Sequence, residues 1–225
     1  YNSYDADWET VFSSLRTYND NLVLMLSELE EIVPENSSVT NMQIAADYLA
    51  TKGVGMIHSV SGVGYTMDLD VDMENWFAKG LNNGLQMRVY FQTMDVKKAK
   101  RRKMVRIGGC FDAALDGCFG SADAAMLEPY EGTDSRGVLY YDQEKVNAFC
   151  KKANREGMQI EIHAIGDAAF QQATRALKAA LDDYPRKDHR HTIIHACLPT
   201  EEGIKICGEY GTQEYYDNVR RAASF

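Results

Sequence analysis

Two histidines close consecutive apolar segments of the chain. His163 follows Ile160-Glu161-Ile162, and His195 follows Thr192-Ile193-Ile194, roughly one strand–helix unit further on. Because parallel strands end at a common edge, both imidazoles are expected at the same rim of a sheet. Histidine is the usual zinc ligand in proteins, so the pair predicts a metal site. The alternative is that each is a hydrogen-bonded core residue, but two equivalent positions favour the metal.

Acidic side chains lie near the same predicted rim. Asp112 and Asp116 flank Ala113-Ala114-Leu115 in a segment that should be buried, where a charge needs a partner. A metal ion is one such partner and a neighbouring Lys or Arg is another. Both carboxylates are therefore candidates to lie near the site. Asp167, at the expected N-cap of the helix after His163, is a further site-lining candidate.

The remaining histidines carry weaker signals. His58 ends its own apolar segment, so it either lines the site or belongs to a loop. His191 lies four residues before His195, about 13 Å away in an extended strand, so it and His189 are expected to be structural or solvated. Cys110 and Cys197 lie in apolar segments, where cysteine is usually a small core residue.

The elements that must position these residues alternate in a regular rhythm. Strands are predicted over 54–60, 87–93, 110–115, 159–164 and 192–196, with helices over 41–52, 71–82, 142–156, 167–184 and 200–210. Compact apolar strands separated by helices are typical of a parallel sheet with crossover helices, either open or closed as a barrel. The basic cluster 97–103 is expected to be a solvated loop or a helix end.

Three regions follow from this pattern. Residues 1–40 should form a helical N-terminal segment, residues 41–211 the α/β unit, and residues 212–225 a tail without assignment. Five strands leave two exposed sheet edges, so self-association into a homo-oligomer is expected.

Composition excludes several classes of protein. The 225 residues carry a formal net charge of −9, which argues against nucleic-acid binding and against binding to anionic membranes. No apolar run is long enough for a membrane span, and no signal peptide is visible. The five cysteines form no CxxC pair, which indicates reduced thiols and a cytoplasmic protein.

Several short motifs together resemble the amidohydrolase superfamily. They are Gly53-Val54-Gly55-Met56-Ile57-His58, Leu115-Asp116-Gly117-Cys118-Phe119-Gly120-Ser121, Leu127-Glu128-Pro129-Tyr130, Arg136-Gly137, His163-Ala164-Ile165-Gly166-Asp167 and Asp188-His189-Arg190-His191 with His195-Ala196. The resemblance implies a TIM-type (β/α)8 barrel that hydrolyses amide or related C–N bonds of a small-molecule substrate with a metal-activated water. It implies one or two divalent metals, most often zinc, and matches His163 and His195 to ligands on strands five and six.

The chain also departs from the family pattern. The HxH pair of strand one and the aspartate of strand eight are absent, so the catalytic residue stays unknown and a partial barrel is expected. The position of the family's strand-four lysine falls on Asp112, so the resemblance makes Asp112 the predicted third metal ligand and leaves Asp116 a predicted site-lining residue. Ser59 follows His58 where aspartate is common. With two histidines, this chain alone is expected to bind zinc poorly or not at all. A catalytically inactive barrel that binds a ligand or partner is the alternative function.

Overall fold

The computed structural model describes residues 37–62 and 66–210, in two compact units. One contains the described residues up to Ile57 together with Phe77–Gln86, and the other contains His58–Trp76 together with the described residues from Met87 onward. The predicted helical N-terminal segment, up to residue 36, and the predicted tail at 212–225 lie outside the described residues.

In the first unit, helix α2 (Ser37–Thr51) begins four residues before the predicted start at Asn41. Its end was predicted correctly: Gly53 has φ +80, and its N–H donates to the Ala50 carbonyl at 3.0 Å. This left-handed conformation after a helix is one that glycine adopts without steric penalty.

Five strands form one sheet in which the spatial order equals the chain order. They are β1 (Met56–Ser61), β2 (Gln86–Phe91), β3 (Arg106–Ala114), β4 (Gln159–Ala164) and β5 (Thr192–His195). The pairs from β2 to β5 are parallel, and the β1–β2 hydrogen bonds advance in the same direction on both strands, from Gln86 N–H to Gly55 O and from Gln92 N–H to Ser61 O. The predicted α/β fold, a partial TIM-type barrel of five parallel strands, is confirmed.

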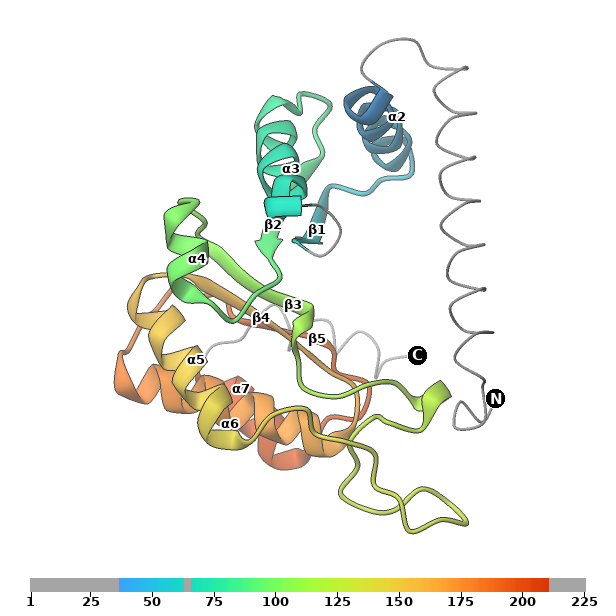
Figure 1. The fold of residues 1–225 in the computed structure, drawn as a ribbon, viewed down its shortest axis with the longest axis vertical. Coiled ribbons are helices and arrows are strands. Elements are labelled where there is room, and N and C mark those ends of the chain that lie inside the picture. The colour runs from blue at the N-terminus through green and yellow to red at the C-terminus, as the bar shows by residue number, and fades with distance from the viewer. Residues whose placement is uncertain (1–36, 63–65, 211–225) are drawn as a thin grey trace. The chain divides into compact units, whose positions relative to one another are not determined.

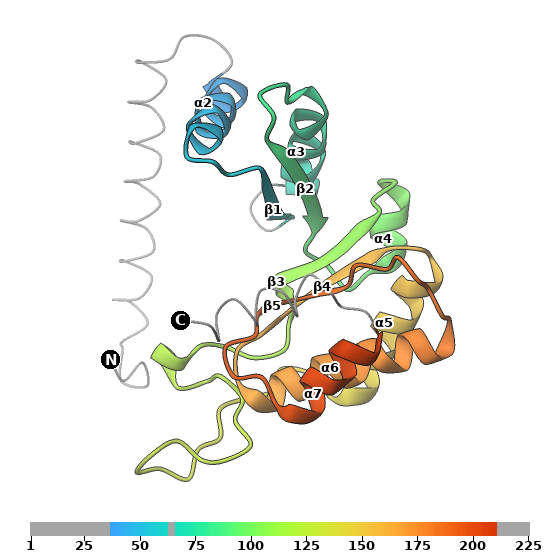
Figure 2. The ribbon, with the colours of Figure 1, turned by 180° about the vertical axis from the view of Figure 1, so that it is seen from behind.

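Crossover helices connect the strands. A 3-10 turn (Thr66–Asp68) precedes α3 (Leu69–Gly80), and α4 (Val96–Arg101) follows β2. Helices α5 (Gln143–Arg155), α6 (Asp167–Asp183) and α7 (Glu201–Tyr210) lie side by side along one face of β3 to β5 (Figures 1 and 2). They bury apolar faces such as Val146, Phe149, Phe170 and Leu177, which orders the strand ends that carry His163 and His195.

Of the two alternatives for the basic cluster 97–103, the helix end is confirmed: Lys98, Lys100 and Arg101 lie in the last turn of α4. The N-cap of this helix, Asp95, accepts hydrogen bonds from the N–H groups of Lys97 and Lys98. The start of one strand was predicted wrongly. Strand β3 begins at Arg106 and not at Cys110, because Gly108 and Gly109, which read as a loop, belong to the strand.

His189 and His191 were expected to be either structural or solvated, and the structure shows that they are structural. Both are buried at 2% exposure. His191 Nδ1 accepts from Ile160 N–H at 3.0 Å and its Nε2 contacts Asn154 Oδ1 at 3.1 Å, while His189 Nε2 contacts the Tyr210 carbonyl at 2.7 Å. Both rings therefore join β4 and β5 to the helices in their neutral form.

We predict that acid destabilises the fold through His191. Burial, together with the nearby His189 and Arg186, lowers the pKa of His191 well below its ordinary 6.5. The unfolded chain therefore binds the proton more tightly, and unfolding becomes easier as pH falls below about 6.5. The loss reaches up to about 1.4 kcal/mol per pH unit until the pH reaches the folded-state pKa. Urea unfolding of the wild type and of His191→Gln between pH 7 and 5 measures this, and equal slopes against pH would contradict it.

Candidate metal centre

One group of potential metal ligands occurs among residues 37–62 and 66–210. The Cys110 sulfur and one ring nitrogen each of His163 and His195 all lie within 4.8 Å of one another. The two rings meet edge to face with centroids 4.6 Å apart. The two histidines that the sequence placed at one rim therefore do come together, at the carboxyl ends of β4 and β5.

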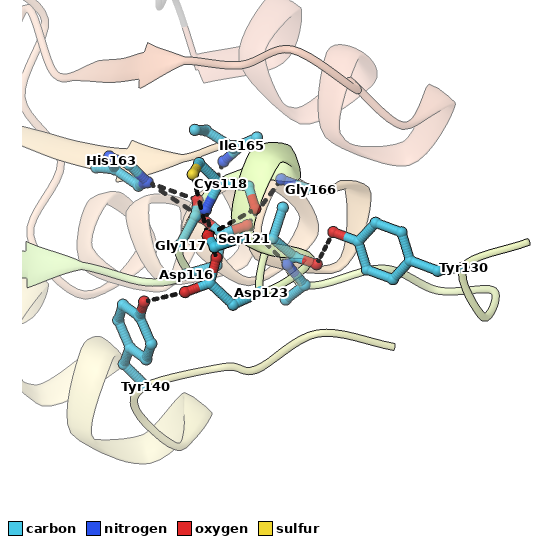
Figure 3. Close-up of polar contacts among 12 residues, drawn as sticks. Asp116, Gly117, Cys118, Ser121, Asp123, Tyr130, Tyr140, His163, Ile165 and Gly166 are labelled. Atoms are coloured by element: carbon cyan, nitrogen blue, oxygen red, sulfur yellow. Dashed lines mark hydrogen bonds and ion pairs between the residues drawn. The ribbon is translucent and has the colours of Figure 1, made fainter. Parts of the chain in front are cut away.

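The carboxylate of Asp116 holds His163 in place. This side chain is fully buried, and its Oδ1 lies 3.4 Å from His163 Nε2. Its two oxygens also accept hydrogen bonds from the backbone N–H groups of Ala125 (2.9 Å), Ile165 (2.9 Å) and Gly166 (2.7 Å). Figure 3 shows these contacts converging on Asp116 from the loop after β3 and from the end of β4. Asp116 therefore joins two loops and orients the imidazole between them.

The electrostatic environment favours positive charge at His163. Burial alone would lower the pKa of this ring, but the contacts with Asp116, Cys110 and the Gly117 carbonyl outweigh burial and raise the pKa to about 10. Burial and the charge of His163 lower the pKa of the neighbouring His195. The positive charge is therefore favoured on His163 and disfavoured on His195, beside a buried carboxylate that favours a cation over a neutral group.

A metal ion fits these residues. His163 Nδ1 is buried and has no hydrogen-bond partner in the described part of the chain. This nitrogen is therefore available to bind a metal ion. A thiol and two imidazoles are the ligand types that zinc prefers. Their separation needs only small side-chain rotations to reach the roughly 3.5 Å expected between neighbouring zinc ligands.

His195 also has an unusual backbone. Its φ is +69, and that of Ala196 is +44, in a region that residues with side chains rarely adopt. Strained conformations of this kind cost about 1–3 kcal/mol each and concentrate at functional sites. The strain at the end of β5 is consistent with a site that requires the imidazole in one orientation.

Two predicted site residues, Asp112 and Asp167, lie outside the ligand group. The Asp112 side chain is exposed and is not among the ligand group of the described residues; its backbone carbonyl accepts a hydrogen bond from the Tyr141 hydroxyl at 2.9 Å. Asp167 is the first residue of α6, whose N-cap is Gly166, and its carboxylate accepts from the N–H groups of Leu127 (2.7 Å) and Ala168 (2.9 Å). The roles of these residues toward metal and substrate stay predictions.

His58 pairs with a buried glutamate on β4. Its Nδ1 lies 3.1 Å from Glu161 Oε1, and its ring lies against Tyr90 at 5.2 Å between centroids. Side chains alternate along a strand, so Glu161 and His163 face the same side of the sheet. His58 therefore lies on the same face of the sheet as His163, and its role as a site-lining residue stays a prediction.

The loop between β3 and α5 is ordered by Asp123. Its carboxylate accepts hydrogen bonds from Cys118 N–H at 2.8 Å, the Ser121 hydroxyl and the Tyr140 hydroxyl at 3.2 Å (Figure 3). A Cβ on Gly117 would lie 2.1 Å from this carboxyl carbon, so a side chain there would have to displace the Asp123 carboxylate. These contacts hold the segment that follows Asp116 to Tyr140, just before α5.

Sequence reasoning did not identify Cys110 and Glu161 as residues of the site. It also missed Gln92, whose Oε1 accepts a hydrogen bond from Cys110 N–H. Cys110 was interpreted as a core residue, although it is only half-buried. Glu161 did carry a signal, since a carboxylate within an apolar strand requires a partner.

Solved structures of other proteins share the fold of this chain. Two solved structures, both titled uncharacterized metal-dependent hydrolases, from Pyrococcus furiosus and Pyrococcus horikoshii, superpose with a TM-score of 0.56 each. They share 21% and 20% sequence identity with this chain, cover 80% of it, and are themselves covered over 38% and 37%. This similarity shows the fold.

The sequence model of the Amidohydrolase family matches residues 16–208, so the chain belongs to that family. It is 36% identical over 99 residues to "Putative amidohydrolase YtcJ" of Bacillus subtilis, a stretch covering 43% of this chain and 18% of that protein. It is 34% identical over 89 residues to "Protein LONG AFTER FAR-RED 3" of Arabidopsis thaliana, covering 39% and 15%. The matched stretches therefore span less than a fifth of either relative.

Proposed function

We propose that this chain forms part of the catalytic barrel of a metal-dependent hydrolase acting on amide or related C–N bonds of small molecules. The observation that carries the proposal is the convergence of His163 and His195 at adjacent strand ends, beside the buried Asp116. Membership of the Amidohydrolase family supports the same reaction class. Zinc is the metal that the donor types favour, and one or two ions are expected in the complete protein.

The residues of this chain have separable tasks in that reaction. His163 and His195 hold the metal, and Asp116 fixes the orientation of His163. When bound, a divalent metal polarises a carbonyl oxygen and makes a water nucleophilic near neutral pH. His58, oriented by Glu161, is proposed to contact the substrate from the same face of the sheet.

Compartment and assembly remain part of the proposal. No helix in the described ranges is long and apolar enough to cross a membrane. All five cysteines are free, which supports the prediction of a reducing, cytoplasmic environment. We also propose that the chain self-associates through its exposed sheet edges into a homo-oligomer. Sedimentation across a concentration series would test this, and a monomer at every concentration would contradict it.

We expect His163→Ala and His195→Ala, each in the complete protein, to lose bound metal and hydrolase activity together. Each substitution removes a metal ligand, and metal-site losses of this kind abolish tight binding. Elemental analysis of the purified protein measures the metal, and a panel of N-acyl and N-formyl amines measures hydrolysis.

His191→Gln is the matched control, because this histidine is buried and away from the ligand group. It should reduce stability and leave metal content unchanged. Full activity and unchanged metal in His195→Ala would overturn the proposed metal site. Retained metal without activity on any amide in the wild type would instead favour the alternative of a ligand-binding barrel.

A further inference from the structure

The sulfur of Cys110 has a more specific position than a core thiol requires. Its Sγ lies within 4.8 Å of a ring nitrogen of both His163 and His195, and the residue is only half-buried. Structural zinc takes four protein ligands, and catalytic zinc takes three with an open position. Two histidines alone are one ligand short of a catalytic site and two short of a structural one.

The backbone of β3 leaves the ladder at this point. Gly109 is paired with Ile162, but the next residue of β4, His163, is paired with Ala114. Strand β3 therefore has four extra residues, 110–113, between two positions that pair with consecutive residues of β4. This bulge frees Cys110 from pairing with β4 and allows its side chain to turn toward the histidines.

Gln92 fixes the bulge. Its side chain is buried at 2% exposure, and its Oε1 accepts from the N–H groups of Cys110 (2.9 Å) and Phe111 (3.2 Å). Its Nε2 donates to the Val60 carbonyl at 3.0 Å. A Cβ on Gly109 would lie 2.5 Å from Gln92 Cγ, so the glycine is what allows this amide to approach. One buried side chain therefore replaces the missing ladder bonds of Cys110.

The same strand has no better placed ligand. The resemblance puts the family's strand-four ligand on Asp112, but that carboxylate is exposed and outside the ligand group. Cys110 comes two residues earlier, at the start of the bulge, and faces the two histidines.

We infer that Cys110 is the third protein ligand of the metal, binding as a thiolate beside His163 and His195, with Gln92 as the residue that positions it. The inference rests on the proposed function. Binding releases the thiol proton to solvent, and a sulfur ligand biases the site toward zinc, cobalt or cadmium over magnesium, calcium or manganese.

Cobalt(II) provides a readout of this ligand that does not depend on activity. The complete protein is stripped of metal, reloaded with one equivalent of Co²⁺ and examined by absorption spectroscopy. We expect a near-ultraviolet sulfur-to-cobalt charge-transfer band that Cys110→Ser abolishes. The control Cys118→Ser, which changes an exposed thiol on the neighbouring loop, should keep the band.

A second measurement does not require a variant to fold. Iodoacetamide labelling followed by peptide mass spectrometry should show Cys110 protected by Zn²⁺ by roughly tenfold or more, with no protection of Cys118.

The outcomes separate the two proposals. Bound cobalt without the charge-transfer band, or equal labelling of Cys110 with and without zinc, would overturn the thiolate and leave the histidine site intact. Failure of cobalt to bind at all would overturn the thiolate together with the proposed metal-dependent function.

Discussion

Asp116→Ala is expected to lower the free energy of unfolding of the metal-free protein by about 3–5 kcal/mol. The carboxylate is fully buried and accepts three backbone N–H groups, from Ala125, Ile165 and Gly166, besides its contact with His163. Alanine leaves these donors without an acceptor, and each unsatisfied buried group costs about 1–3 kcal/mol. Partial relaxation and entry of water keep the total below the simple sum.

Asp112→Asn is the matched control, because it changes a carboxylate of the same strand region that is exposed to solvent. It should shift stability by no more than about 0.5 kcal/mol. Urea unfolding monitored by circular dichroism in the presence of a chelator measures both variants. Equal midpoints for Asp116→Ala and the wild type would show that water satisfies these N–H groups and that Asp116 does not join the two loops.

The second half of the chain was the most predictable from sequence. Strands β4 and β5 are short apolar runs, and α6 has a strongly amphipathic pattern, so local preference and burial agree. Asp142 caps α5 as expected, accepting from Lys145 N–H at 2.7 Å. Parallel order follows from this rhythm, and it brings His163 and His195 to one rim without further information.

Cys110 could not be assigned in the same way. Its position depends on the register shift of β3 between Gly109 and Ala114, which pattern reasoning did not detect because the strand predicted over 110–115 was read as continuous. Gln92 falls inside the strand predicted over 87–93, although β2 ends at Phe91, and its type alone does not point to a positioning role. Only the three-dimensional pairing shows that its amide replaces the ladder hydrogen bonds of the bulge.

Asp112 and Asp116 show the limit of reasoning from burial alone. Both were expected inside a buried strand, which would give each a reason to bind a metal. The bulge instead turns Asp112 into solvent and leaves Asp116 beyond the strand end, where backbone N–H groups satisfy it. A partner for a buried charge was correctly predicted for Asp116, but the partner is largely backbone.

Gly108→Ala should have the largest effect of any single methyl group added to the sheet. Gly108 has φ +108, and a Cβ there would lie 1.9 Å from the Glu161 carbonyl oxygen of the paired strand. Backbone atoms cannot rotate away as a flexible side chain can, so β3 and β4 must separate locally. We expect a loss of about 4 kcal/mol or more in unfolding free energy, since clash and backbone strain add to broken ladder bonds.

The comparison with Gly157→Ala isolates the clash. Gly157 also has a left-handed φ, +76, but nothing lies within 4 Å of its added Cβ. That variant should lose only the cost of placing a side chain in this conformation, about 1–2 kcal/mol. Because Glu161 pairs with His58 and lies two residues before His163, strand separation at Gly108 should also reduce zinc retention, whereas Gly157→Ala should leave it unchanged. Similar unfolding midpoints for the two alanine variants, with equal zinc content, would show that β3 and β4 do not approach as closely as the pairing of Gly108 with Glu161 requires.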